Sequence, residues 1–491
     1  VAAVVPSFVV MAAVMGGAVA LGSVFCFRLA GVVRILAVTV GAVVVAVAMH
    51  LPWSLELITA PSWWEAVAGV GSTNGGPLTL GRVIRFESGP WGAPPLGWAF
   101  LLAGALPVVI GRSWRLEWAV RAWFVALAGW GLLWAGQAGH LPFGLPPAEV
   151  VLAPAAAALA LTAALGIASF DTDLRAYKFG WRQLLSVVAA LGVVLGAVPL
   201  AAGLIDGRWR MPARGFAASL DPLVSTEGRP AARVLWIGDP ELLPASGWRY
   251  DDDMAYAATD RGVPTVLDRL PGAPPGATPL LADSLRLAED GRTDRLGHLL
   301  APMGVRYVVV ISRLAPSSTT ITGQRTPPRS LTAMLAQQLD LEEIPVADGL
   351  LVYRNTAAPS ARSVLPAREG DRTEFTDAVA DELAGAEPAL TEDSGAVGAV
   401  GEVPAAGDVL VSQTADDDWQ LRIDGVPVAR RTDYGWTNLF TTSRAGSATL
   451  TYQTPVLHRL ASMGQVALWV AVLVVRRRLR RRERFALGGE A

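Results

Sequence analysis

The sequence predicts an α-helical multi-pass membrane region, followed by an extracytoplasmic α/β domain and a small β-sandwich, with a C-terminal transmembrane helix closing the chain. Three observations support this fold class. The 491 residues are 52% hydrophobic and only 17% charged, whereas a soluble domain carries about 25% charged residues. Long apolar runs fill most of the first two hundred residues. The net charge is +3 over 1–204, −11 over 205–456 and +6 over 457–491, so three physically different regions are joined.

The apolar runs predict seven membrane spans, because a helix needs about 20 apolar residues to cross the hydrocarbon core. They lie near 2–26, 32–50, 96–111, 119–136, 149–169, 184–204 and 460–475, and the third and the last are short. Basic residues gather in every second connection and after the last span, whereas the other two connections hold only Arg82 and Arg85. Cytoplasmic loops carry the positive charge. We therefore expect residues 205–456 outside the cell membrane and the C-terminus in the cytoplasm.

The pattern after the sixth span changes from helical to mixed and then to β. The runs 232–239, 305–312 and 349–355 are apolar and rich in β-formers, and Gly304 ends a helical pattern before the second of them. The predicted divisions are six spans with an outer loop at 51–95 (1–204), an α/β domain (205–365), a helix and linker (366–405), a β-sandwich (406–456), a transmembrane helix (457–475) and a basic cytoplasmic tail (476–491).

Composition also excludes several kinds of site. A single cysteine, Cys26, rules out an intrachain disulfide, and the four histidines have no metal-ligand spacing. We expect no cofactor and no nucleic-acid partner; the alternative is a divalent cation at the aspartate runs 251–253 or 416–418, since clustered carboxylates suit a hard cation. The chain begins inside an apolar stretch, and we expect it to be a fragment of a longer protein.

Three segments of the second half, 298–310, 349–366 and 407–455, resemble in this order the C-terminal half of the bacterial lipoteichoic-acid-glycosylation (YfhO-like) family of multi-pass membrane proteins. The matching positions are Gly304, Val305, Tyr307, Val352, Tyr353, Asn355, Pro359, Trp419, Ile423, Asp424 and Gly425. The chain also resembles the membrane half of large actinobacterial proteins that begin with a cytoplasmic family-2 glycosyltransferase domain. These resemblances imply a GT-C-like membrane region and glycosyl transfer to or from an envelope lipid or polymer. The acidic early outer loop of the family is not identifiable in this sequence.

The outer loop 51–95 carries the candidate active site. Its catalytic candidates are Glu56 and Glu65, and its substrate-binding candidates are Arg82, Arg85, Trp63, Trp64 and Glu87. A membrane glycosyltransferase with a polyprenyl-phosphate sugar donor needs a carboxylate that accepts the proton of the acceptor hydroxyl. It also needs cations that hold the phosphate leaving group, which arginine does through two hydrogen bonds. We predict a glutamate of this loop as the base, one of its two arginines as the phosphate contact, and tryptophan rings as sugar-stacking surfaces.

Other interpretations of the same residues stay open. Tryptophan is enriched at membrane surfaces, so the loop 51–95 is also consistent with an interfacial segment without catalysis. The chain would then be a membrane scaffold whose outer domain binds glycan or a partner enzyme. A transporter is disfavoured, because the spans hold almost no charged residues in their interiors. Trp419 and Trp436 suit either a sugar-binding platform or the sandwich core. The predicted partners are the polyprenyl-phosphate sugar donor, an envelope glycan acceptor and membrane lipids.

Overall fold

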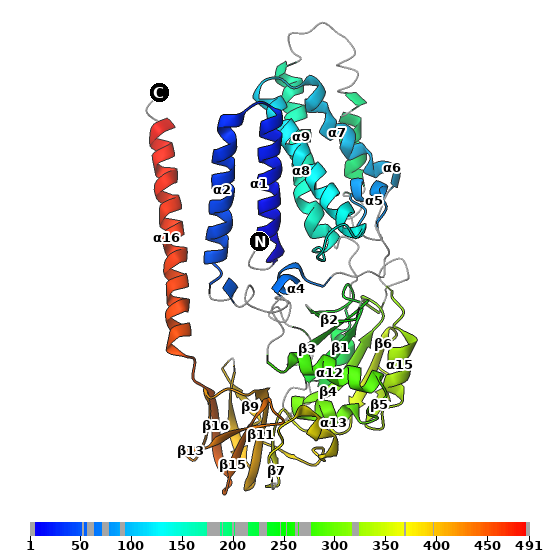
Figure 1. Cartoon of the computed structure of the whole chain (residues 1–491), viewed down its shortest axis with the longest axis vertical. Helices are drawn as coiled ribbons and strands as arrows, with labels where there is room; N and C mark the ends of the chain where they lie inside the picture. The colour runs from blue at the N-terminus through cyan, green and yellow to red at the C-terminus, as the bar shows by residue number, and fades with distance from the viewer. Residues whose placement is uncertain are drawn as a thin grey trace.

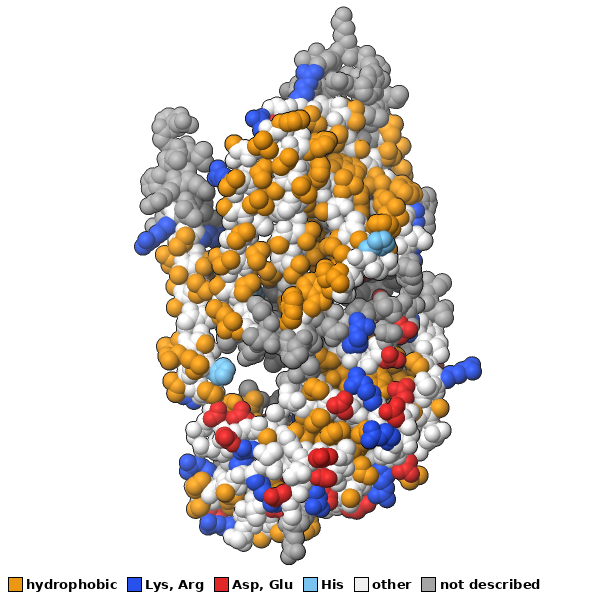
Figure 2. Space-filling view, viewed as in Figure 1, with side chains coloured by type: hydrophobic (Ala, Val, Ile, Leu, Met, Phe, Trp, Pro, Cys, Tyr) orange, Lys and Arg blue, Asp and Glu red, His pale blue; other side chains and the backbone are white. Residues whose placement is uncertain are grey.

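The computed structural model describes most of the chain, and Figure 1 shows a group of long helices at one end and two β-rich units at the other. The described residues are 5–51, 54–55, 63–70, 78–88, 94–173, 187–188, 190–198, 201, 215–224, 233–245, 247–251, 253–260, 264, 276–316, 324–367, 370–395 and 397–487. Figure 2 shows apolar side chains over the helices, and charged side chains gathered on the β-rich units.

The long helices are α1 (Ser7–Phe25), α2 (Leu29–Ala48), α8 (Trp114–Gln137), α9 (Ala148–Asp173) and α16 (Val456–Leu487). Each holds an apolar stretch long enough to cross a membrane, so the described part of the chain has five candidate spans. These five coincide with five of the predicted spans. The predicted span at 96–111 forms α7 (Ala99–Ile110), which is only 12 residues long. The predicted span at 184–204 lies in part outside the described residues.

The direction of the helices agrees with the alternation of charge along the sequence. In Figure 1, the α1–α2 and α7–α8 connections and the C-terminal end of α16 lie at the end of the helices that points away from the β-rich units. The first two connections hold Arg28 and Arg112, and α16 ends in an arginine-rich segment. The segments with clustered arginine therefore share one end, and the β-rich units lie at the opposite end.

A six-stranded sheet with the order β2-β3-β1-β4-β6-β5 forms the α/β unit. Its strands are β1 (Arg233–Gly238), β2 (Trp248–Asp251), β3 (Met254–Thr259), β4 (Val305–Ile311), β5 (Leu341–Ile344) and β6 (Leu350–Asn355). β1 and β4 are parallel, and the other neighbours in the sheet are antiparallel. The three strands that the sequence predicts here are confirmed as β1, β4 and β6.

The central strands of this sheet are buried on both faces. Leu235 and Ile237 of β1 pack in one core with α12 (Thr278–Glu289), α13 (Leu296–Leu300) and α15 (Arg329–Ala336). Val234 and Trp236 point to the other face, where α11 (Ala217–Val224) covers them. Side chains alternate between the two faces of a strand. Helices on both faces therefore explain why β1 is apolar throughout instead of alternating with polar residues.

Two five-stranded sheets form the sandwich, with the orders β14-β15-β11-β7-β8 and β13-β12-β16-β10-β9. The strands of the first are β7 (Arg362–Leu365), β8 (Glu387–Pro388), β11 (Gly407–Thr414), β14 (Arg430–Asp433) and β15 (Thr437–Thr442). Those of the second are β9 (Glu392–Ser394), β10 (Gly398–Val403), β12 (Trp419–Ile423), β13 (Val426–Val428) and β16 (Gly446–Tyr452). The predicted strands over 406–454 are confirmed as β11, β12, β15 and β16.

The prediction of a helix and linker over 366–405 is wrong. This segment forms a short 3-10 helix, η3 (Phe375–Ala380), and then the strands β8, β9 and β10. Ala399 and Val403 of β10 are buried in the sandwich core, and β10 pairs with β16, which lies about fifty residues further along the chain. A glycine-rich segment has low strand propensity by itself. Here, pairing with a distant strand decides its structure.

One core joins the two β-rich units. Val409 and Val411 of β11 face the second sandwich sheet. Leu410 between them points the other way, and it belongs to the same core cluster as Leu300 of α13. The first sandwich sheet is therefore buried on both faces, by the second sheet and by the α/β unit.

Candidate functional site

The described part of the outer loop consists of three short helices, α4 (Trp63–Ala68), α5 (Leu80–Ile84) and α6 (Pro94–Gly97). Figure 1 places α4 between the long helices and the α/β unit, with α5 and α6 beside the long helices. Val83 anchors α5, because its side chain is fully buried in the core formed with α8 and α9. Of the two predicted catalytic glutamates, Glu65 lies on α4, and Glu56 lies outside the described residues.

Arg85 and Glu87 form a bidentate ion pair just after α5. Arg85 Nε donates to Glu87 Oε1 at 3.0 Å, and Nη2 donates to Oε2 at 2.8 Å. Only 17% of the arginine side chain and 8% of the glutamate side chain are exposed. The guanidinium carbon also lies 5.3 Å from the centre of the Trp98 ring. Hydrogen bonding to Glu87 raises the pKa of Arg85, which keeps the guanidinium charged.

This pair bears on the predicted phosphate contact. Arginine holds a phosphate best with the two parallel N–H groups of one edge, and Glu87 occupies Nε and Nη2 of Arg85. A phosphate oxygen would have to displace the carboxylate from that edge. Arg82, the other predicted contact, lies on α5 three residues before Arg85, which places the two on neighbouring positions of one helical surface.

The two tryptophans of α4 differ in their surroundings. Trp64 Nε1 donates to the carbonyl oxygen of Gly144 at 2.6 Å, and its ring meets the edge of Phe143 at 5.1 Å between centroids. These contacts fasten α4 to the α8–α9 connection. Trp63 is 46% exposed, and its ring meets the Trp64 ring at 5.5 Å and 78°. Of the two predicted sugar-stacking rings, Trp63 has more surface available, and Trp64 anchors the helix.

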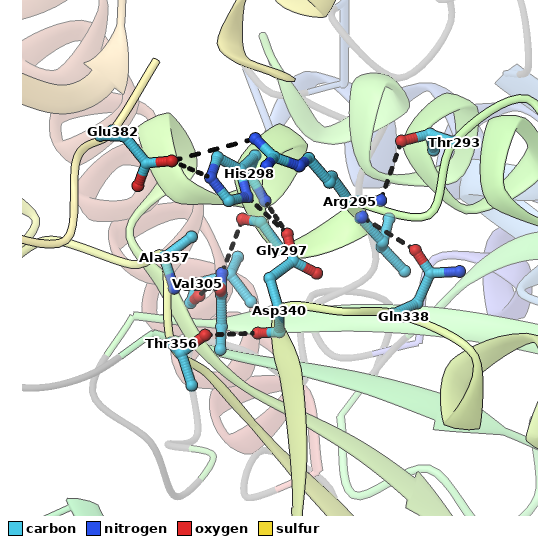
Figure 3. A network of polar contacts seen from close by, with 12 residues as sticks. Thr293, Arg295, Gly297, His298, Val305, Gln338, Asp340, Thr356, Ala357 and Glu382 are labelled. Carbon is cyan, nitrogen blue, oxygen red and sulfur yellow. Dashed lines mark hydrogen bonds and ion pairs between the residues drawn. The ribbon is translucent and has the colours of Figure 1, made fainter. Parts of the chain in front are cut away.

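A second polar cluster surrounds His298 of α13 (Figure 3). The ring Nδ1 lies 2.6 Å from Asp340 Oδ2, and the backbone N–H of His298 donates to the same oxygen at 2.8 Å. The ring Nε2 lies 3.4 Å from Glu382 Oε1. His298 and Asp340 are buried, whereas Glu382 is 74% exposed. A protonated ring would donate to both carboxylates, and a neutral ring to only one.

The same cluster caps the start of α13. The backbone N–H of Leu296 donates to Gln338 Oε1 at 2.9 Å, and Asp340 accepts from the backbone of His298. The first N–H groups of a helix have no partner inside it, and these two side chains accept hydrogen bonds from two of them. Sequence reasoning missed this cluster, because Asp340 lies 42 positions from His298 and no local spacing connects them.

A third polar cluster, the strand-end cluster, consists of Asp239, Glu241 and Arg325. Asp239 directly follows β1, and the backbone N–H of Arg325 donates to the carbonyl of Ser312, which directly follows β4. Arg325 Nε lies 3.5 Å from Asp239 Oδ2, and Nη2 donates to Glu241 Oε2 at 3.1 Å. Because β1 and β4 are parallel, their carboxyl ends bring these segments to one edge of the sheet.

The charges of the strand-end cluster are unequally shielded. The side chain of Asp239 is 2% exposed, that of Arg325 is 31% exposed and that of Glu241 is 57% exposed. Partial burial raises the pKa of Glu241, and the negative charges of Asp239 and Glu149 raise it further. Glu149 stands in the first turn of α9. Its effect on Glu241 places the strand-end cluster near the outer loop end of the long helices.

The second aspartate run and the sandwich tryptophans have structural surroundings, whereas Asp252 of the first run lies outside the described residues. Within the described residues, no group of three His, Cys, Asp or Glu side chains is placed to hold a metal ion. In the second run, Asp416 accepts from Tyr452 Oη at 3.0 Å, and Asp417 pairs with Arg430. Trp419 and Trp436 are 9% and 8% exposed, so both belong to the core and neither offers a platform for a sugar.

No protein-family model and no curated protein matches the sequence, so the resemblance drawn from the short motifs stays a prediction. The chain is similar to a solved structure of the arabinofuranosyltransferase AftD from mycobacteria, determined by single-particle cryo-electron microscopy. The identity is 13% and the TM-score 0.28, over 87% of this chain and 42% of that chain. The chain thus spans less than half of that protein.

Proposed function

We propose that the chain is part of an integral-membrane glycosyltransferase that acts on bacterial cell-envelope glycans or glycolipids with a polyprenyl-phosphate sugar donor. The observation that carries the proposal is the position of the outer loop. Trp63, Trp64 and Glu65 lie on α4 and Arg82 lies on α5, at the end of the long apolar helices where we place a lipid-linked sugar. The β-rich units, on the same side, would hold the polymer acceptor.

The chemistry needs three roles. A carboxylate, for which we propose Glu56 or Glu65, takes the proton of the acceptor hydroxyl. The acceptor oxygen then bonds to the anomeric carbon of the sugar while the bond from that carbon to the phosphate oxygen breaks, and the polyprenyl phosphate leaves. Arg82 would stabilise the charge on the departing phosphate. Arg85 would join it only if Glu87 released its guanidinium, and the exposed Trp63 would stack on the sugar ring.

Transfer assays on the full chain in native membranes test this function. The donors would be polyprenyl phosphates that carry radiolabelled pentoses or hexoses, and the acceptor an envelope glycan extract. We expect Glu56→Gln or Glu65→Gln to abolish transfer at normal membrane levels, while the matched control Glu342→Gln, on β5 of the outer unit, retains it. Full activity in the Glu56→Gln, Glu65→Gln and Glu87→Gln variants would contradict the proposal.

A second function is a non-catalytic membrane scaffold whose outer units bind glycan or a partner enzyme. The Arg85–Glu87 pair favours the scaffold, because two mostly buried groups that hydrogen-bond to each other serve a structural role. The two functions differ in their outcome. A scaffold would retain its glycan or partner binding in the Glu56→Gln and Glu65→Gln variants, and the wild-type chain would transfer no sugar from any of the donors.

A further inference from the structure

A patch of aromatic and basic side chains lies where α1 ends and α8 begins. It consists of residues 25–28 and 112–121, and we call it the α1–α8 patch. Both segments lie at the end of the long helices that points away from the β-rich units (Figure 1). The Phe25 ring packs against Phe124 of α8 at 5.5 Å between centroids, so side-chain packing joins the two segments.

Positive charge exceeds negative charge in the α1–α8 patch. Nε and Nη2 of Arg28 donate to Glu117 Oε1 at 3.0 and 2.7 Å. Arg121 Nη2 lies 3.5 Å from the other oxygen of the same carboxylate. Arg112 and Arg115 belong to the patch as well, and its sequence holds no second acidic residue. Four arginines and one glutamate give a formal net charge of +3 at the end of apolar helices.

The guanidinium of Arg28 has one edge that Glu117 does not use. The carboxylate contacts the edge formed by Nε and Nη2, and among the described residues no acceptor is bonded to Nη1. The side chain is 63% exposed, in contrast to the 17% of Arg85. A phosphate can therefore accept two parallel hydrogen bonds from the Nη1–Nη2 edge of Arg28 without displacing the carboxylate.

Exposed aromatic side chains surround these charges. Trp114 and Trp118 stand one turn apart on α8 and are 54% and 43% exposed, and the guanidinium carbons of Arg115 and Arg121 lie 5.4 and 5.0 Å from the centres of these rings. Phe27 is 92% exposed at a φ of 57°, which a bulky side chain rarely adopts. Tryptophan favours the level of the lipid headgroups. The rings therefore suit contact with lipid better than contact with water.

The surroundings of the α1–α8 patch select the class of ligand. A soluble anion would pair with the arginines and would leave the aromatic rings in water. An anionic phospholipid matches both features, because its phosphate pairs with a guanidinium while its glycerol and acyl groups cover apolar surface. Such surface continues from the patch along α2, where Leu29 and Val33 are 64% and 75% exposed. Basic segments next to membrane spans attract anionic lipids in this way.

We propose that the α1–α8 patch binds one anionic phospholipid. The lipid phosphate accepts hydrogen bonds from the Nη1–Nη2 edge of Arg28, and the other arginines of the patch add positive charge around it. The glycerol region lies beside Trp114 and Trp118, and the acyl chains follow the exposed face of α2. This site is independent of the proposed function, because it lies at the opposite end of the long helices from α4 and α5.

Native mass spectrometry of the full chain in detergent tests this proposal. The protein would be titrated with phosphatidylglycerol and with phosphatidylcholine of the same acyl chains, and we expect phosphatidylglycerol to bind about tenfold more tightly. Arg28→Gln should weaken phosphatidylglycerol binding about tenfold, as expected for lost hydrogen bonds to a charged group. Arg28→Lys keeps the charge beside Glu117 but has no planar edge for a phosphate, so it should also weaken binding.

The chain offers a matched control at the other end of the helices. Arg459 is an exposed arginine near the start of α16, next to the sandwich, and Arg459→Gln should leave phosphatidylglycerol binding unchanged. Equal affinity for the two lipids would overturn the proposal, as would wild-type affinity in Arg28→Gln and Arg28→Lys, or equal losses in Arg28→Gln and Arg459→Gln. Glycerol phosphate, a soluble headgroup analogue, should not displace the lipid. Displacement would indicate an anion site that needs no membrane lipid, and would also overturn the proposal.

Discussion

The ring Nδ1 of His298 and the carboxylate of Asp340 lie 2.6 Å apart in the interior of the α/β unit, and the same carboxylate oxygen accepts the backbone N–H of His298. One buried oxygen thus holds both the ring and the first turn of α13. We expect Asp340→Ala to lower the free energy of unfolding by about 1–3 kcal/mol. It removes the partner of the buried ring Nδ1 and one of the two acceptors of the His298 backbone N–H, which also donates to the carbonyl of Arg295.

The measurement is denaturant unfolding of the full chain in detergent micelles, followed by tryptophan fluorescence. Glu382→Gln is the matched control, since that side chain is 74% exposed at its contact with the same ring, and we expect a change within about 0.5 kcal/mol. Equal unfolding midpoints for Asp340→Ala and the wild type would show that the contact does not stabilise the unit.

Gly297 provides an independent test of the same packing. A Cβ at this position would lie 2.4 Å from Asn355 Oδ1 and 2.7 Å from Asp340 Cγ. We therefore expect Gly297→Ala to cost about 1–3 kcal/mol through overpacking. Gly385→Ala is the control, because a Cβ there has no atom within 4 Å. Thermal unfolding compares the two, and a Gly297→Ala midpoint as high as that of Gly385→Ala would contradict the packing around Asp340.

The Arg85–Glu87 pair predicts strong coupling between two side chains of the outer loop. Arg85→Gln leaves a carboxylate that is 8% exposed without its partner, and we expect a lower unfolding temperature than in the wild type. The double variant with Glu87→Gln should be more stable than the sum of the single changes predicts, since it leaves no isolated charge. Thermal unfolding in micelles gives the coupling energy. Additive effects would show that the two groups do not stabilise each other.

The tyrosines of the α/β unit predict a loss of stability at high pH. Burial raises the pKa of Tyr256 to about 12, from an ordinary value of 10. The unfolded chain therefore releases this proton first, so the contribution of Tyr256 is complete below pH 10 and is lost as the pH rises towards 12. We expect the unfolding temperature to fall over this range, and to fall less steeply in Tyr256→Phe. Equal slopes for the two proteins would contradict the shift.

The sequence predicted much of the fold because its strongest signals are local. Five long apolar helices, the strands β1, β4 and β6, and four sandwich strands follow from runs of residues that need no knowledge of their partners. The strand β10 was missed, because Ala399 and Val403 are its only fully buried side chains among glycines and a glutamate. The hydrogen bonds of β10 come from its pairing with β16, which no local sequence pattern predicts.

The sequence predicted which residue types the candidate site contains, but not which of their side chains contact one another. The sequence indicated that glutamates, arginines and tryptophans share the loop 51–95, but not that Glu87 would occupy the guanidinium of Arg85 or that Trp64 would fasten α4 to Gly144. The strand-end cluster gave no sequence signal, because Asp239 and Arg325 are 86 positions apart and meet only through the parallel pairing of β1 with β4.

The sequence by itself determined where the chain is apolar, where its charge changes sign and which segments are helical or extended, since these depend on hydrophobicity and neighbouring residues. The tertiary structure alone decided which polar groups meet and which are left with unused hydrogen bonds. It also decided that Leu410 and Val409, adjacent in β11, belong to two different cores. The physical reason is that burial and hydrogen bonding between distant segments depend on how sheets and helices pack, which no local pattern encodes.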